Sequence, residues 1–220
     1  YRPRCIVSSF IRLRPLSMLG RIGQPEDRSK AVVCRSPGRR RVATVRARRS
    51  RVILTHDVIL REIASGRLVI DPLMPDQVGP ASIDLHLGDE IRVMEGGPPV
   101  IDLDEAADYR TVTQVRPLIE PYLLQPGETI HGITRERIRL PPDVGGWLEG
   151  RSRYARLGLM IHVTAGFVAP GVDNRQGLEM SKVAGRPLAI RAGIRLCQIV
   201  LQRAEGEAIY AGRFANQQRL

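Results

Sequence analysis

One segment of the chain has the apolar spacing of an amphipathic helix. In THDVILREIASGRL, residues 55–68, Ile59 and Ile63 lie four positions apart and therefore share one face. Thr55 stands where a helix N-cap is expected, and Gly66 can end the helix in a left-handed conformation. The pattern predicts one short helix near the start of the folded region.

After this helix, apolar and polar residues alternate in short runs, which is typical of β-strands. The predicted strands lie within residues 82–87, 90–94, 137–143, 159–163 and 187–202, the last of them folded at Ala192–Gly193, with a turn at 125–128. Residues 95–120 have no period and predict a long loop. The last eleven residues predict a tail that lies over the rest of the fold. Many short strands and a single clear helix predict a mainly β fold, a sandwich or a distorted barrel.

The positive charge is concentrated in the first 51 residues. They hold fourteen arginines and Lys30 against Glu26 and Asp27, a net charge of +13, and because the whole chain carries +11, residues 52–220 carry −2. The Arg-rich stretch has no regular period, which predicts a disordered leader before one β domain at 52–220. Three interpretations of the leader stay open: a nucleic-acid-binding arm, an organellar transit peptide, or translated sequence upstream of the true start, since the chain begins with Tyr1. The near-neutral remainder argues against nucleic-acid binding as the main function.

Cysteine usage and hydropathy indicate the cellular compartment. The three cysteines, at positions 5, 34 and 197, form no CxxC pair, which argues against a disulfide framework and against a zinc cluster. No apolar run reaches the length that spans a membrane. Arg12, Arg14 and Pro15 interrupt the apolar stretches near the start, so no secretory signal is predicted. We expect a cytoplasmic protein without a membrane partner.

The stretch EGRSRYARLGLMIHVTAGFVAPG, residues 149–171, carries the candidate chemistry. Ser152 stands at the N-cap position of a short helix predicted over 151–157, where it shares a face with Arg156. A strand follows, and a bend then returns the chain to Glu179. Guanidinium groups bind phosphate, and a strand-borne carboxylate can transfer protons, so the set suits a phosphorylated substrate. On spacing alone, a solvated helix with Glu179 in solvent stays an open alternative.

Five motifs, in order and spacing, resemble one enzyme family. They are ILTHDVILREIASGRLVIDP (53–72), QVGPASIDLHLGDEIRV (77–93), YLLQPGE (122–128), LEGRSRYARLGLMIHVTAGF (148–167) and NQQ (216–218). From about Arg51 to Gln218 the chain resembles the dCTP deaminases of the trimeric dUTPase superfamily. The resemblance implies a distorted, jelly-roll-like β-barrel of the dUTPase type and homotrimers with active sites at subunit interfaces. It also implies hydrolysis of dCTP to dUTP and ammonia in pyrimidine deoxynucleotide metabolism. The H-x-E and P-C-x-x-C pattern of zinc deaminases is absent, which agrees with a zinc-independent reaction.

The resemblance implies a role for each matching residue. Glu179 would be the general base, Ser152 would orient the attacking water, and Arg156 would hold Glu179 and polarise the site. Substrate-binding positions would be Arg151, Arg153, Val163, Thr164, Ala165, Tyr210, Arg213 and Gln217, and Asp84 would support the site through neighbouring arginines. Mg²⁺ would accompany the triphosphate. We expect burial of Glu179 between its apolar neighbours to raise its pKa.

The chain also departs from the family pattern. Ala169 replaces an aspartate that usually faces the sugar and serves the dUTPase reaction, so its loss argues against dUTPase activity. Arg153 replaces a serine, VDNRQG at 172–177 lacks the usual apolar alternation, and the tail between Tyr210 and Arg213 is short. A catalytically impaired nucleotide-binding homologue and a deaminase for a modified cytosine nucleotide therefore stay open. His162, on the predicted strand at 159–163, is more typical of a structural histidine than of a catalytic one.

Overall fold

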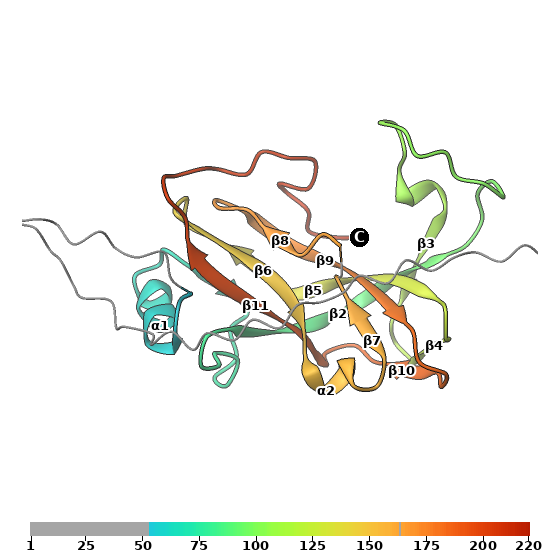
Figure 1. Cartoon of the computed structure of the whole chain (residues 1–220), viewed down its shortest axis with the longest axis horizontal. Helices are drawn as coiled ribbons and strands as arrows, with labels where there is room; N and C mark the ends of the chain where they lie inside the picture. Colours follow the sequence, from blue (N-terminus) through green and yellow to red (C-terminus); the bar gives the residue numbers. More distant parts are fainter. Residues whose placement is uncertain (1–52, 163) are drawn as a thin grey trace, which may run out of the picture. The chain divides into compact units, whose positions relative to one another are not determined.

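The computed structural model describes residues 53–162 and 164–220. The predicted leader at 1–51 and the candidate Val163 lie outside the described residues. The described chain forms a nine-stranded sheet, in the order β7-β9-β5-β2-β11-β6-β8 with β1 beside β5 and β3 beside β2, and a separate β10-β4 pair (Figure 1). The strands are β1 (Val69–Asp71), β2 (Ile83–Met94), β3 (Thr113–Pro117), β4 (Tyr122–Leu124), β5 (Thr129–Arg139), β6 (Val144–Gly150), β7 (Leu159–Ile161), β8 (Phe167–Val168), β9 (Asp173–Lys182), β10 (Leu188–Ile190) and β11 (Arg195–Arg203). The predicted mainly β, barrel-like fold is confirmed.

Two predicted strands are one long strand in the structure. Segments 82–87 and 90–94 join as β2, and the register between β2 and β5 shifts between Leu87 and Ile91. This irregularity places two consecutive residues, Leu87 and Gly88, in the buried interior, so the apolar alternation breaks there although the strand continues. The expected loop at 95–120 is also shorter than predicted. It contains the 3-10 helix η1 (Tyr109–Thr111) and strand β3, most of whose residues are exposed and therefore show no alternation.

The predicted helix near the start is present as α1 (His56–Ala64), with Thr55 at the N-cap. Gly66, with φ +71°, follows its end. The second helix is shorter than predicted: α2 covers Ser152–Ala155, and its N-cap is Arg151 rather than Ser152. The reason is that the Arg151 carbonyl already accepts hydrogen bonds from two backbone N–H groups of the helix. No helix within 53–162 and 164–220 is long and apolar enough to cross a membrane.

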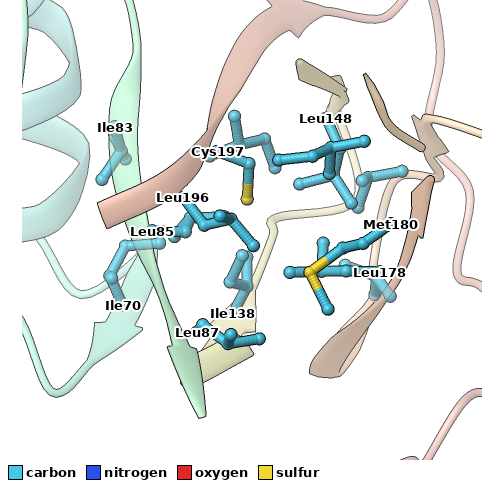
Figure 2. Close-up of a cluster of buried hydrophobic side chains, with 14 of the residues drawn as sticks. Ile70, Ile83, Leu85, Leu87, Ile138, Leu148, Leu178, Met180, Leu196 and Cys197 are labelled. Atoms are coloured by element: carbon cyan, nitrogen blue, oxygen red, sulfur yellow. The ribbon is translucent and has the colours of Figure 1, made fainter. Parts of the chain in front are cut away.

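The hydrophobic core lies against one face of β5 and β9. Leu178 and Met180 of β9 are almost fully buried, and they pack with residues such as Leu87, Leu148 and Ile138 (Figure 2). Burial of each such side chain stabilises the fold by about 1.5–3 kcal/mol. Because side chains alternate along a strand, the residue between Leu178 and Met180 must face away from this core.

A buried polar network joins the loop after β1 to β2 and β5. Glu136 is 1% exposed, and its carboxylate accepts hydrogen bonds from Gln77 Nε2 at 2.8 Å and from the backbone N–H of His86 at 2.9 Å. The Glu136 Oε1 atom also lies 2.6 Å from His86 Nδ1. Gln77, itself fully buried, donates to the Asp84 carbonyl and accepts from the Met74 backbone N–H. The network satisfies a buried carboxylate that would otherwise be costly.

Gln77→Ala is expected to lower the free energy of unfolding by about 2–4 kcal/mol, because the buried Glu136 carboxylate and the partly buried Asp84 carbonyl lose a donor. Urea denaturation measures the change. Gln114→Ala, on the exposed side of β3, is the control and should stay within about 0.5 kcal/mol of the parent. Equal stabilities of the two variants would contradict the role assigned to the network.

Candidate active site

The face of β5 and β9 that points away from the core borders a cavity of about 450 Å³. Its wall combines residues of these two strands with the bend after β7, the η1 segment and the C-terminal tail. The lining residues that matter most below are Tyr109, His131, His162, Ala169, Glu179 and Tyr210. The cavity therefore collects polar side chains from segments that are far apart in the sequence.

Glu179 lies between two histidines in this cavity. His131 of β5 is its direct partner across the strand pair. On the other side, His162 Nδ1 is in close contact with Glu179 Oε2, and the His162 backbone N–H donates to the Glu179 carbonyl at 2.9 Å. The His162 ring is therefore held directly against the Glu179 carboxylate.

His162 has an unusual backbone conformation. Its φ is +55°, in the left-handed region that residues other than glycine rarely adopt. The predicted strand over 159–163 therefore ends at Ile161, and the chain turns at His162. The side chain of His162 meets the carboxylate of the candidate base, a position that the alternating pattern of LMIHV gave no reason to expect.

The pKa of Glu179 is lower than that of an ordinary glutamate, in contrast to the raised pKa expected from the sequence. Burial raises it, but the nearby His162 ring and, more weakly, His131 favour the carboxylate and outweigh burial. The side chain is 47% exposed, because β9 turns it toward the cavity and not toward the core. Glu179 is thus ionised at neutral pH.

The C-terminal tail lies over the cavity, as predicted for the last eleven residues. The Phe214 carbonyl accepts from Asn174 Nδ2 at 2.6 Å, and the Gln217 carbonyl accepts from the Arg175 backbone N–H at 2.9 Å. A Cβ atom at Gly171 would lie 2.7 Å from the Cα of Ile209, so glycine lets the chain pass closely here. Two of the predicted substrate-binding residues, Tyr210 and Gln217, line the cavity from the tail.

Arg213, the third predicted binding residue of the tail, does not line the cavity. Its Nη2 atom lies 3.2 Å from Asp108 Oδ2, which also binds Arg110 at 2.6 Å. Arg110 holds the pKa of Asp108 well below its usual range, with a smaller contribution from Arg213. The loop before β3 therefore holds the arginine that the resemblance assigns to the triphosphate.

The candidates on and near α2 are apart from Glu179. None of the described residues that line the 450 Å³ cavity comes from α2, so Ser152, Arg153 and Arg156 do not share it. Lys182, almost fully buried, fixes the turn after α2 by donating to the Leu157 carbonyl at 3.0 Å and to the Ala184 carbonyl at 2.6 Å. These bonds anchor the segment that follows the helix.

Arg151 and Asp84 do come together. Arg151 Nη2 lies 3.2 Å from Asp84 Oδ2, and Arg195 Nη1 lies 4.0 Å from the same oxygen.

The last two predicted substrate-binding residues line different cavities. Ala165 lines the cavity of Glu179, whereas Thr164 lines a second cavity of about 610 Å³ beside α2.

Sequence reasoning missed several residues of this cavity. His131 and Tyr109 were not predicted, and their rings are in edge-to-face contact with centroids 5.3 Å apart. In TIHGI, residues 129–133, a polar His131 lies between apolar residues. This pattern indicates that His131 faces away from the core, but it does not reveal which residue of another strand lies beside it. Among the residues that the structure describes, no group of three or more His, Cys, Asp and Glu side chains is arranged to hold a metal ion.

Comparison with known proteins gives a consistent result. A family model described as dCTP deaminase-like matches residues 53–204. A dCTP deaminase of Halorubrum lacusprofundi is 38% identical over 163 residues, which cover 71% of this chain and 80% of that protein. A dUMP-forming dCTP deaminase of Acidothermus cellulolyticus is 36% identical over 175 residues, covering 76% of this chain and 91% of that protein. The solved 2'-deoxycytidine 5'-triphosphate deaminase from Agrobacterium tumefaciens is 25% identical with a TM-score of 0.57. That match covers 71% of this chain and 49%, about half, of the solved chain.

Replacing His162 with Phe is expected to raise the pKa of Glu179, because burial then acts with less opposition. Carboxyl ¹³C NMR titration of Glu179 measures the shift. His56→Gln, on the exposed helix α1, serves as the control and should leave the titration unchanged. An unaltered Glu179 pKa in His162→Phe would show that the contact does not govern the carboxylate.

Proposed function

Because the chain belongs to the dCTP deaminase family, we propose that it hydrolyses the 4-amino group of dCTP to give a uracil nucleotide and ammonia. The single observation that carries this proposal is the Glu179 carboxylate, held beside His162 in a 450 Å³ cavity that the C-terminal tail covers. A cavity of this size suits a small-molecule ligand. We expect the enzyme to act in the cytoplasm, in deoxynucleotide metabolism.

Glu179 serves as the general base in this proposal. It takes a proton from water as the water oxygen bonds to C4 of the cytosine, and it delivers this proton to N3. In the second half of the reaction it takes the proton of the new hydroxyl group and gives it to the 4-amino nitrogen. The C4–N bond then breaks, ammonia leaves, and the C4 carbonyl of uracil forms. What supports the role is that Glu179 is ionised and is oriented by its contact with His162.

We propose further that the complete site lies between copies of the chain, in a homotrimer. Ser152 and Arg156, which the family resemblance assigns to the site of Glu179, do not line its cavity within one chain. A neighbouring copy that places its α2 at this cavity would supply them. Exposed apolar side chains beside the second cavity support such contacts: Trp147 and Phe167 are 40% and 59% exposed, with ring centroids 5.6 Å apart.

The proposed product is dUTP and not dUMP. Release of dUMP needs a second hydrolysis, at the phosphates, and therefore a second activated water. Ala169 lines the cavity at the position where the family pattern has an aspartate, and a methyl group cannot accept a proton. This chain is similar in sequence to dUMP-forming relatives. It nevertheless lacks the aspartate side chain that we associate with hydrolysis at the phosphates.

Magnesium enters this proposal only with the substrate. The described residues offer no cluster of carboxylate or imidazole ligands for a resident ion. Mg²⁺ commonly keeps several waters and binds the phosphates of a nucleotide. We therefore assign it to the triphosphate, and the proton transfers above involve only Glu179, water and the base.

Glu179→Gln is expected to lower ammonia release from dCTP by about 10³-fold or more, because the proton acceptor is lost with little change of shape. The assay measures ammonia with dCTP and Mg²⁺ and identifies the nucleotide by chromatography, with dUTP as the expected product. Nucleotide binding should persist. Binding without release by the unmodified chain would favour the impaired homologue, and normal turnover by Glu179→Gln would refute the base.

Mixing two inactive variants tests the shared site. Ser152→Ala and Glu179→Gln chains, unfolded and refolded together in equal amounts, should regain about a quarter of the parent activity, because that share of randomly formed interfaces holds both intact residues. Each variant refolded alone is the control. If the site were built within one chain, the mixture would stay as inactive as its components.

A further inference from the structure

A row of charged and titratable side chains crosses the outer face of the sheet. Arg92 on β2 is the direct cross-strand partner of His131 on β5, and His131 is the direct partner of Glu179 on β9. His162, just after β7, contacts Glu179 from the far side. Side chains of directly opposed residues have Cβ atoms about 4.5–5.5 Å apart, so each member of the row lies next to the following one.

His131 is held in place by its surroundings. The ring of Tyr109 meets it edge to face, with an interplanar angle of 75°. The Arg92 guanidinium lies over the Tyr109 ring, 5.5 Å from the ring centre. Arg92 is itself fixed by the carbonyl and the hydroxyl of Thr113 and by the Leu220 carbonyl of the tail. The imidazole of His131 therefore faces the cavity from a packed position.

Three groups with titratable or charged atoms face His131: Arg92 from β2, Glu179 from β9 and Tyr109 from η1. Burial lowers the pKa of His131, Glu179 acts in the opposite direction, and Arg92 reinforces the effect of burial. The net direction is downward, so His131 is a neutral imidazole at neutral pH and gains its proton only in more acid solution.

We propose that His131 is a positioning residue for deamination, which acts through Glu179: neutral, it leaves the carboxylate basic enough to take a proton from water, and protonated, it weakens that base. This inference rests on the proposed function. Arg92 contributes to this effect, because its positive charge opposes the protonation of His131. His131 lies outside the five motifs, and Arg92 lies within the motif at 77–93 without a role assigned to it there. Both roles are assigned here by strand register and packing.

The sign of the effect follows from the charges. As the pH falls through the pKa of His131, an imidazolium forms beside Glu179 and stabilises its carboxylate. A more stable carboxylate is a weaker base, so proton abstraction from water slows. The turnover number should therefore decline on the acid side as His131 gains its proton, apart from any decline that protonation of Glu179 causes.

The test compares kcat profiles of the full chain between about pH 5 and about pH 8. In His131→Leu the acid decline that comes from His131 should disappear, so the ratio of kcat at about pH 5.5 to kcat at about pH 7.5 rises about threefold over the parent. In Arg92→Gln the decline should move to higher pH. The double variant should lack the acid decline as His131→Leu does, because the effect of Arg92 on this decline acts through His131. His56→Gln is the control and should keep the parent profile.

A second measurement does not depend on turnover. Ring NMR titration of His131 should give a higher pKa in Arg92→Gln and a lower one in Glu179→Gln, since the opposing cation or the favouring anion is removed. A parent chain that releases no ammonia, while these two shifts occur, would reject the proposed function but retain the coupling of the row. An unmoved His131 pKa in both variants, or an unchanged acid decline of kcat in His131→Leu, would overturn the inference.

Discussion

The pairing of β5 with β9 is the constraint on which the rest of the site depends. Leu178 and Met180 are buried in the core together with Ile130 of the partner strand. Each of these side chains contributes about 1.5–3 kcal/mol on burial. A slip of one residue in the register would expose them and turn Glu179 inward, so the core fixes the direction of the carboxylate. The candidate base is thus oriented by residues that never meet the substrate.

The same register arranges the electrostatics of the cavity. It places a histidine on one side of Glu179, and the left-handed turn at His162 brings a second one to the other side. Without these neighbours, burial would raise the pKa of the carboxylate. With them, Glu179 is ionised although it lies in a cavity with several apolar walls. Backbone geometry at two places therefore contributes to the lowered pKa of one side chain.

The sequence allowed the elements to be predicted better than their contacts. The spacing of Ile59 and Ile63 predicted α1, and the alternation of apolar and polar residues predicted a mainly β fold. It did not reveal that His131 faces Glu179, because this pairing joins strands far apart in the chain and depends on the register shift between Ile133 and Arg137. Family motifs led to Glu179. They gave no signal for Tyr109, which comes from a segment without periodicity, nor for the capture of Arg213 by Asp108.

The attachment of the tail has a consequence for how this protein can change over evolutionary time. Its carbonyls at Phe214 and Gln217 accept hydrogen bonds from β9, and its N–H at Tyr210 donates to the Pro170 carbonyl in the turn before β9. Any residue except proline supplies the same N–H, and every residue supplies the carbonyl. Side chains at most positions of the tail can therefore be replaced without loosening the cover of the cavity. The fold therefore leaves the ligand-facing side chains of the tail to be chosen by binding alone, because backbone bonds maintain the path of the chain that carries them.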